Sequence, residues 1–391
     1  MTSFFDDLPD IPENYEECEY KNDPREFKIN STIGMIYNEY GSLMQHPFIK
    51  EIEKELVEAQ LDKEYTKLQG LPDYYNQVFK IFFNQEYSDG GNFYAGQSVT
   101  GGSALRICSD VIKNFLTDTI YVSNLTFSFY YDLFSKLNIQ QYPYYNSSKK
   151  NLDFIALIDF LNNIPDNSAI NLQLSNHNPT GIDFSSHQWD DLAEVFKKKN
   201  HFALFDCAYL GLASGTVEGD IYGLRKFQSL EIEFLLAFSS AKCTRNYSDD
   251  VGGVIAWLKD PKSTSNLQSL FNSYNRGFYS LPSLQGARIF TKIFKEKREE
   301  FDVSLKNTVE HLNLLREKIV NTLKKKGVKD EFISFLNLQK GIYMFLDLLS
   351  EQLNELKIKY AIYLGEHGRV NLTSINSKNI EYFCECISKI I

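Results

Sequence analysis

The chain has 391 residues, 43% of them hydrophobic and 24% charged, enough for one large and one small α/β domain, each with its own core. Its formal net charge of −10 argues against nucleic acid or an anionic membrane as the main partner. No apolar run approaches the roughly 18 residues that suggest a membrane-spanning helix, so no membrane association is expected.

The N-terminal segment, residues 1–45, is predicted to form an arm and part of the small domain. Its first part, Met1 to Tyr20, is rich in Asp and Glu and contains no Arg, the opposite of a mitochondrial transit peptide. None of the six cysteines has the spacing of a disulfide framework or a zinc site, so no metal is expected. Both observations favour a cytoplasmic protein.

The middle of the chain, residues 46–290, alternates between strand and helix patterns and is predicted to be the large domain. Helical patterns such as Gln188 to Lys199 separate the strands, which favours a largely parallel sheet between layers of helices. The candidate strands are Asp118 to Val122, Ile170 to Leu174, His201 to Phe205, Glu233 to Phe238 and Val251 to Trp257.

The C-terminal part, residues 291–391, is predicted to contain a bridging helix and the rest of the small domain. A long helical stretch from Leu284 to Lys326 would connect the domains, and a closing helix would begin at Lys378. Between them lie three short candidate strands, Gly341 to Leu346, Tyr360 to Leu364 and Arg369 to Leu372.

Polar side chains stand at the ends of successive candidate strands, where open α/β sheets build their sites. Asn178 follows one strand, Asp206 and Tyr209 follow the next, and Lys242 follows the third. Pyridoxal phosphate needs these groups: a lysine amine for the Schiff base, a carboxylate for the protonated pyridine nitrogen, and hydrogen-bonding groups for the phenolic oxygen.

A glycine-containing turn, Thr100-Gly101-Gly102-Ser103, precedes the helical pattern Ala104 to Phe115. Its backbone N–H groups and hydroxyls could hold a phosphate at a helix N-terminus. Such a turn is weak evidence by itself.

The order and spacing of Asn178, Asp206, Tyr209 and Lys242 resemble the fold-type I pyridoxal phosphate-dependent aminotransferases, specifically the aspartate aminotransferase family. The resemblance implies a large domain with a mainly parallel seven-stranded sheet between helices, and a smaller α/β domain. It also implies a homodimer whose active sites are shared between subunits.

Further cofactor contacts follow from the same resemblance. Gly101, Gly102 and Ser103, followed by Ala-Leu-Arg at 104–106, would bind the phosphate together with Ser239, and Tyr65 would reach the phosphate in the neighbouring subunit. Phe127 stands where the family has a tryptophan stacked on the cofactor ring; a phenyl face can also stack, and a core position is the alternative.

Substrate contacts are also implied. Arg369 resembles the arginine that binds the substrate α-carboxylate, with Asn178 beside it, and Gly34 resembles a backbone contact near that group. Arg276, 34 residues after Lys242, resembles the arginine that binds the side-chain carboxylate across the dimer interface. Tyr343 stands where the family has an aromatic lining residue.

The implied reaction is a ping-pong transfer of the amino group between L-aspartate and 2-oxoglutarate, giving oxaloacetate and L-glutamate. Lys242, Asp206 and Tyr209 would be the catalytic residues. His177, beside Asn178, is interpreted as structural.

The phosphate site departs from the family pattern. Asp250 stands eight residues after Lys242, where the family has a phosphate-binding arginine, and Gly102 and Ser103 replace the usual threonine and glycine. Ser103 or Arg245 could compensate. Two alternatives stay open: Asp250 favours a non-catalytic partner of this fold with impaired cofactor binding, and a lining rich in Phe and Tyr favours an aminotransferase with a broader, aromatic substrate range.

Overall fold

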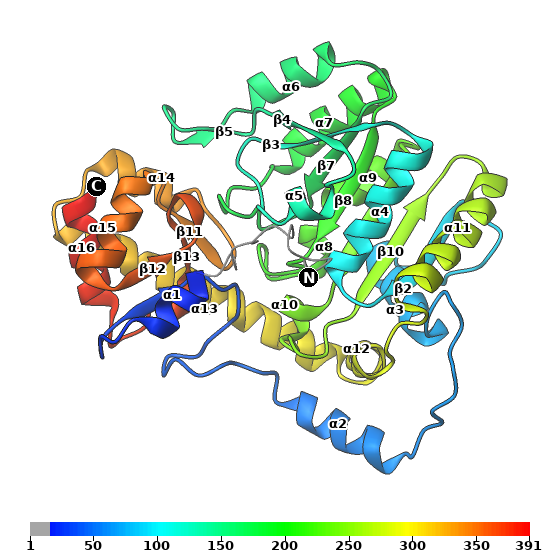
Figure 1. Ribbon diagram of the computed structural model, residues 1–391, viewed down its shortest axis with the longest axis horizontal. Coiled ribbons are helices and arrows are strands. Elements are labelled where there is room, and N and C mark those ends of the chain that lie inside the picture. Colours follow the sequence, from blue (N-terminus) through cyan, green and yellow to red (C-terminus); the bar gives the residue numbers. More distant parts are fainter. Residues whose placement is uncertain (1–15) are drawn as a thin grey trace, which may run out of the picture.

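A seven-stranded sheet forms the centre of the computed structural model, which describes residues 16–391 (Figure 1). Neighbouring strands are parallel except β10, which is antiparallel to both of its neighbours. In spatial order the strands are β2 (Phe93–Ser98), β10 (Gly252–Trp257), β9 (Phe234–Ser239), β8 (Phe202–Cys207), β7 (Ala169–Gln173), β3 (Thr119–Ser123) and β4 (Asn138–Tyr142). The predicted α/β fold of fold type I, with its mainly parallel seven-stranded sheet, is confirmed.

Both faces of the sheet are buried because successive side chains of each central strand enter different hydrophobic clusters. On β9, Phe234, Leu236 and Phe238 belong to one cluster, whereas Leu235 and Ala237 belong to the other. This explains why the strand reads as a continuous apolar run rather than an alternating one.

Helices cover the two faces of the sheet (Figure 1). Helix α4 packs on β9 and β10, and α3 packs on β2. The helices of this part are α2 (Phe48–Glu58), α3 (Pro72–Phe83), α4 (Gly101–Phe115), α5 (Tyr130–Leu133), α6 (Phe154–Asn163), α7 (Ser186–Lys199), α8 (Val217–Asp220), α9 (Tyr222–Ser229), α10 (Ala241–Thr244), α11 (Pro261–Tyr279) and α12 (Gln285–Glu296); β5 (Tyr145–Asn146) pairs with β6 (Asn151–Leu152).

Strands β2 and β4 were not among the sequence predictions, whereas the five strands predicted between residues 46 and 290 lie within one or two residues of their observed positions. Both missed strands form the outer edges of the sheet. Strand β4 carries mainly polar residues, and β2 contains Gly96 and Gln97. Strand β4 is largely exposed, whereas β2 is buried under α3 and α11 but its apolar run is interrupted by Gly96 and Gln97, so neither has the run that identifies a central strand.

The long C-terminal helical stretch is divided into two helices, which corrects the single stretch predicted from Leu284 to Lys326. Helix α12 ends at Glu296, and α13 (Arg298–Lys325) begins after Lys297, whose φ of −125° and ψ of 24° are not helical. Phe294 packs on Phe301 across the break, with ring centroids 4.7 Å apart. Tertiary packing here overrides a sequence that contains neither Pro nor Gly at the break.

The smaller α/β part combines both ends of the described chain. Strand β1 (Ile29–Ser31) pairs in parallel with β12 (Ile362–Leu364), and β11 (Tyr343–Phe345) pairs with β13 (Arg369–Asn371). Helices α1 (Glu16–Asn22), α14 (Asp330–Asn337), α15 (Ser350–Tyr360) and α16 (Ile380–Ile390) surround them, with short 3-10 turns at Glu366–Gly368 and Leu372–Ser374. The domain boundaries at residues 45 and 290 stay predictions, and residues 1–15 of the expected arm lie outside the described part.

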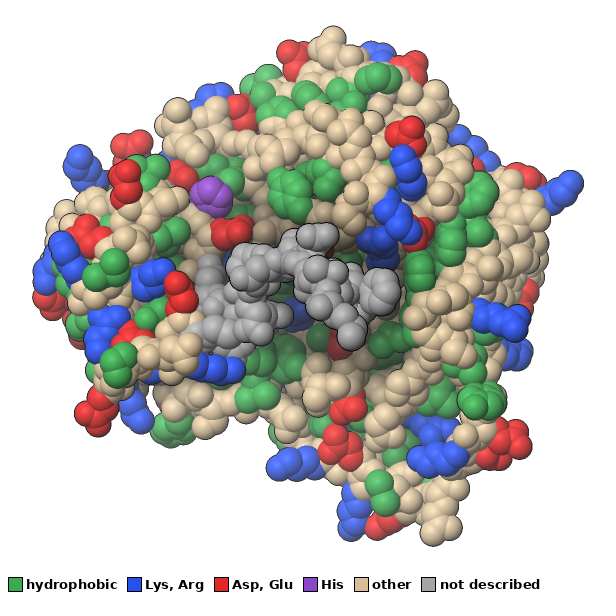
Figure 2. Space-filling model, viewed as in Figure 1, with side chains coloured by type: hydrophobic (Ala, Val, Ile, Leu, Met, Phe, Trp, Pro, Cys, Tyr) green, Lys and Arg blue, Asp and Glu red, His purple; other side chains and the backbone are tan. Residues whose placement is uncertain are grey.

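Charged side chains of both signs are interspersed over the face shown in Figure 2, so the negative net charge is not gathered into one patch there. None of the helices within residues 16–391 is both long and apolar enough to cross a bilayer. The same residues contain no group of His, Cys, Asp or Glu arranged to hold a metal ion.

Candidate active site

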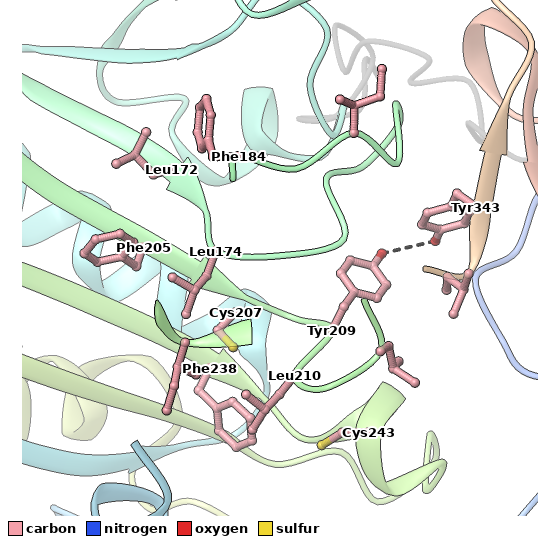
Figure 3. Close-up of a cluster of buried hydrophobic side chains, with 14 of the residues drawn as sticks. Leu172, Leu174, Phe184, Phe205, Cys207, Tyr209, Leu210, Phe238, Cys243 and Tyr343 are labelled. Carbon is pink, nitrogen blue, oxygen red and sulfur yellow. Dashed lines mark hydrogen bonds between the residues drawn. The ribbon is translucent and has the colours of Figure 1, made fainter. Parts of the chain in front are cut away.

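Asn178, Asp206, Tyr209 and Lys242 lie together because β7, β8 and β9 are adjacent parallel strands whose carboxyl ends meet at one edge of the sheet. Tyr209, on the loop after β8, points towards Tyr343 of β11 (Figure 3). The candidate site is therefore formed between the large sheet and the smaller α/β part.

Asp206 receives a hydrogen bond from a tyrosine that the sequence analysis missed. The hydroxyl of Tyr130 donates to Oδ2 of Asp206 at 2.5 Å, and the Tyr130 side chain is fully buried. Burial raises the pKa of Asp206 to about 6, although the Tyr130 hydrogen bond and the charge of Lys242 act to lower it. No motif marked Tyr130; its place three residues after Phe127 was the only available signal.

Lys242 lies in α10, the short helix that follows β9, and its side chain is half-buried. Its Nζ lies 5.7 Å from the centroid of the Tyr209 ring. Burial raises the pKa values of Asp206 and Asp250, and the Lys242 charge opposes both rises, so the amine is close enough to influence both carboxyl groups. This places the only amine of the cluster beside the predicted ring-binding groups.

Tyr209 and Tyr343 are hydrogen-bonded to each other through their hydroxyls at 3.1 Å (Figure 3). Burial, with Tyr343 beside it, raises the pKa of Tyr209 well above its ordinary value, so the phenol is protonated at neutral pH. A Cβ atom at Gly34 would lie 2.0 Å from the hydroxyl oxygen of Tyr343. Gly34 is therefore beside the site, and its lack of a side chain is what lets Tyr343 approach.

Arg369 is connected to Asn178 and to the N-terminal segment. Its Nη1 donates to Oδ1 of Asn178 at 2.9 Å, and its Nη2 donates to the carbonyl of Thr32 at 2.6 Å. The guanidinium lies over the Tyr343 ring, 4.7 Å from the centroid, and its buried Nε has no partner among the described residues. The Asn178 amide in turn donates to the Tyr209 hydroxyl at 3.4 Å.

Phe127 is half-buried and lines a small pocket with Asn178, Arg369 and Glu366. Its ring contacts Phe129 and Tyr130 edge to face, with centroids 5.9 and 5.8 Å apart. The ring is thus at the pocket wall while also packing on its neighbours, so the stacking role stays a prediction.

The turn at Gly101 begins α4 and lies against the end of β9. A Cβ atom at Gly101 would lie 2.4 Å from Cβ of Ser239, whereas one at Gly102 would meet nothing closer than 3.5 Å. Ser103 and Thr100 form a capping box: the Ser103 hydroxyl donates to the Thr100 carbonyl at 2.8 Å and accepts from the Thr100 N–H at 2.9 Å. Its hydrogen is therefore already used, which argues against Ser103 as a replacement hydroxyl donor.

Asp250 lies among the predicted phosphate-binding groups. Gly101 and Ser239, with Ser240 and Ala241 beside them, form what we call the phosphate cradle. The Asp250 carboxylate accepts hydrogen bonds from the N–H of Ala241 at 2.8 Å and from the hydroxyls of Ser239 and Ser240 at 3.2–3.3 Å. The backbone N–H of Gly101, at the start of α4, also acts to lower the pKa of Asp250. Burial nevertheless raises its pKa above the ordinary value.

Arg245, the nearest cation in the sequence after Lys242, does not contact this cradle. It is 1% exposed, and its guanidinium donates to the Thr308 hydroxyl and, at 3.4 Å, to the Ser304 carbonyl of α13. Burial lowers its pKa to about 10, so it stays charged at neutral pH. The prediction that Arg245 could supply the missing positive charge beside Asp250 is therefore wrong in this structure.

Tyr65 and Arg276 are the two predicted residues that the single chain does not bring into the cluster. The Tyr65 side chain is 94% exposed on the connection between α2 and α3, and Arg276 is exposed in the last turn of α11. His177, by contrast, is buried with Nε2 bonded to the Ser123 hydroxyl and Nδ1 to the Thr180 hydroxyl. Burial lowers its pKa to about 3, in agreement with a structural role.

The groups on the ring side suit pyridoxal phosphate: an amine, a carboxylate supported by a phenol, and two neutral polar side chains lie together. The cradle supplies hydroxyl and N–H donors for a phosphate, with Asp250 as the one anionic group bonded to them. The donor set fits the cofactor provided that Asp250 does not add a full negative charge.

The chain is similar to known proteins along most of its length. The family model for aminotransferase class I and II matches residues 31–387. The mitochondrial aspartate aminotransferase of Schizosaccharomyces pombe is 32% identical over 377 residues, which are 95% of this chain and 86% of that protein.

Two solved structures extend the likeness to the fold. The cytoplasmic aspartate aminotransferase of Saccharomyces cerevisiae has a TM-score of 0.93 at 26% identity, covering 99% of this chain and 98% of that one. An aromatic-amino-acid aminotransferase of Burkholderia pseudomallei, covalently bound to pyridoxal phosphate, has a TM-score of 0.93 at 24% identity over the full length of both chains.

Proposed function

Since the chain belongs to the aminotransferase class I and II family, and is therefore a pyridoxal phosphate-dependent transaminase, we propose that it exchanges the amino group between L-aspartate and 2-oxoglutarate. The family assignment favours an enzyme over a non-catalytic partner. The main support for an amino acid substrate is Arg369, a cation that is fixed beside Asn178 and Tyr343 and lines the small pocket.

The proposed roles follow from the position of each side chain. The cofactor, when bound, supplies an electron sink for the substrate α-carbon. Lys242 is proposed to hold the cofactor covalently and then to move the proton at the α-carbon. Asp206, hydrogen-bonded by Tyr130, is proposed to keep the pyridine nitrogen protonated, while Tyr209 and Asn178 donate to the phenolic oxygen.

Specificity for dicarboxylates is proposed to come from Arg276 of a second subunit. Arg276 and Tyr65 are both exposed in the single chain, as expected for residues that act across a homodimer interface. Aspartate, glutamate, oxaloacetate and 2-oxoglutarate would share the same two-arginine arrangement. The cytoplasmic location stays a prediction, since the similar proteins include mitochondrial and cytoplasmic forms.

A comparison of amino donors tests this specificity. We expect kcat/KM for aspartate to exceed that for phenylalanine, and Arg276→Ala to lower the aspartate value at least about 30-fold, because an unpaired substrate carboxylate costs about 2 kcal/mol or more. Phenylalanine turnover should not fall. Lys262→Ala, which removes another exposed cation of α11, is the control.

The aromatic alternative is tested by the same assay. Phe127, Tyr209 and Tyr343 give the site an aromatic wall, which is the observation that favours it. Equal turnover of phenylalanine and aspartate, unchanged in Arg276→Ala, would contradict the dicarboxylate proposal.

A further inference from the structure

The Asp250 carboxylate is a hydrogen-bond acceptor inside the phosphate cradle. A bound phosphate would need the same hydrogen-bond donors. Asp250 accepts from the hydroxyls of Ser239 and Ser240 and from the N–H of Ala241, and the N–H of Gly101 acts to lower its pKa. These are the donors at the end of β9 and the start of α4 that face the predicted phosphate position. An ionised carboxylate and a phosphate dianion cannot both accept at close range without a proton between them.

Asp250 cannot withdraw by a simple backbone shift. Its neighbour Val251 accepts from the N–H of Ser240 at 3.0 Å and donates to the Ser240 hydroxyl at 3.2 Å. A Cβ atom at Gly252 would lie 2.1 Å from the Thr100 carbonyl, so this strand start is pressed against the beginning of α4. The carboxyl group is therefore tethered in the cradle.

The charged groups around Asp250 do not neutralise the two acceptors, which are the Asp250 carboxylate and a bound phosphate. Burial raises the pKa of Asp250, the charge of Lys242 opposes that rise, and Lys242 is the residue proposed to bind the cofactor covalently. Tyr74 of α3 and Cys243 of α10 also face Asp250; burial and the Asp250 charge raise both pKa values, that of Cys243 to about 12, so both stay neutral. Arg245 is bonded to α13.

We propose that Asp250 makes cofactor binding proton-linked: the cofactor phosphate occupies the cradle with one proton held between it and the Asp250 carboxyl. The proton lets Asp250 or the phosphate act as a donor in place of a missing cation. The free phosphate ester loses its second proton at a pH of about 6, so at higher pH the proton must be taken up from solvent on binding.

Affinity should therefore depend on pH in a defined way. When the carboxyl and the phosphate are both ionised in the free state, uptake of one proton makes Kd rise about tenfold per pH unit. In Asp250→Asn the amide donates without a proton, so this rise should disappear. At pH 8 the variant should bind at least about tenfold more tightly than the wild type.

Calorimetric titration of the apoprotein with pyridoxal phosphate tests the inference without any amino donor. Since the inference rests on the family's cofactor and not on aspartate as substrate, its failure is distinct from failure of the specificity assay. Titrations at pH 6–8.5 in two buffers of different ionisation enthalpy give both Kd and the number of protons taken up. The pyridine ring contributes equally to wild type and variant, and the Lys242 amine, whose charge acts on Asp250, is common to the pyridoxal and pyridoxal phosphate titrations of the wild type described below.

We expect the wild type to take up about one proton more than Asp250→Asn at pH 8, and Asp249→Asn, the adjacent control, to match the wild type. Identical proton numbers and Kd slopes in wild type and Asp250→Asn, or weaker binding by the variant at every pH, would overturn the proposal.

If Asp250→Asn does not fold, the wild type alone decides. Pyridoxal lacks the phosphate, so pyridoxal phosphate should take up about one proton more than pyridoxal at pH 8, and equal numbers would also overturn the proposal.

Discussion

Removal of the Tyr130 hydroxyl is expected to disturb Asp206 without disturbing the fold. Tyr130→Phe keeps the ring that stacks on Phe134, at a centroid distance of 5.1 Å, and removes only the donor that lies 2.5 Å from Oδ2 of Asp206. A hydrogen bond to a charged group contributes about 1.5–3 kcal/mol, which corresponds to roughly a 10- to 100-fold change in the proton dissociation constant of Asp206.

The direction of the change follows from which form of Asp206 the hydroxyl stabilises. The bond favours the carboxylate, and its loss raises the pKa of Asp206 above its value of about 6, so the carboxyl of the apoprotein becomes protonated at neutral pH. The folded chain already holds this proton more tightly than the unfolded chain. As the pH rises, the wild type should therefore lose free energy of unfolding up to a pH of about 6. In the variant this loss should continue to a higher pH.

Carbon-13 spectra of apoprotein labelled at the Asp carboxyl carbons would follow this titration between pH 4.5 and 9, with Asp206→Asn to assign the signal. Tyr131→Phe is the matched control, since Tyr131 is the next residue, is exposed, and bonds Gln141 rather than Asp206. The explanation is refuted if Asp206 titrates at the same pH in Tyr130→Phe as in the wild type.

Two further predictions concern the covalent and phosphate ends of the site. Lys242→Ala should abolish transamination and retain a cooperative thermal transition, because the half-buried amine lies 5.7 Å from the Tyr209 ring and acts on Asp206 and Asp250 through its charge; measurable turnover in this variant would exclude Lys242 as the essential amine. Gly101→Ala should weaken cofactor binding and lower thermal stability, because its Cβ would lie 2.4 Å from Cβ of Ser239. Gly102→Ala should be tolerated, because its Cβ would have no atom closer than 3.5 Å. Equal effects of the two substitutions in calorimetric and thermal assays would contradict this account of the turn.

The sequence was sufficient to predict the central strands because each of them is buried on two faces. Strand β9 is apolar up to Ser239 and its neighbours are largely apolar, so the polar residues at their carboxyl ends mark the edge where Asn178, Asp206 and Lys242 meet. Strand β4 gave no such signal, since an edge strand tolerates polar side chains.

The remaining features depend on contacts between distant parts of the chain. Tyr130 is one of 24 tyrosines, and only the fold brings its hydroxyl to a carboxylate 76 residues further along. Arg245 is three residues from Lys242, yet a left-handed conformation at φ 55° and the packing of α13 direct it away from the cradle. The break at Lys297 likewise reflects the packing of Phe294 on Phe301 and not any local signal.

The contacts that hold the Arg369 guanidinium in place reduce the conformational entropy that is lost when a substrate carboxylate binds. A free arginine side chain carries about 2 kcal/mol of rotamer entropy, which a flexible surface arginine would lose when a carboxylate fixes it. Here Asn178, Thr32 and the Tyr343 ring have already fixed the guanidinium. Most of that ordering occurs when the chain folds, which corresponds to a gain of up to about 30-fold in carboxylate affinity over an unbraced arginine in the same position.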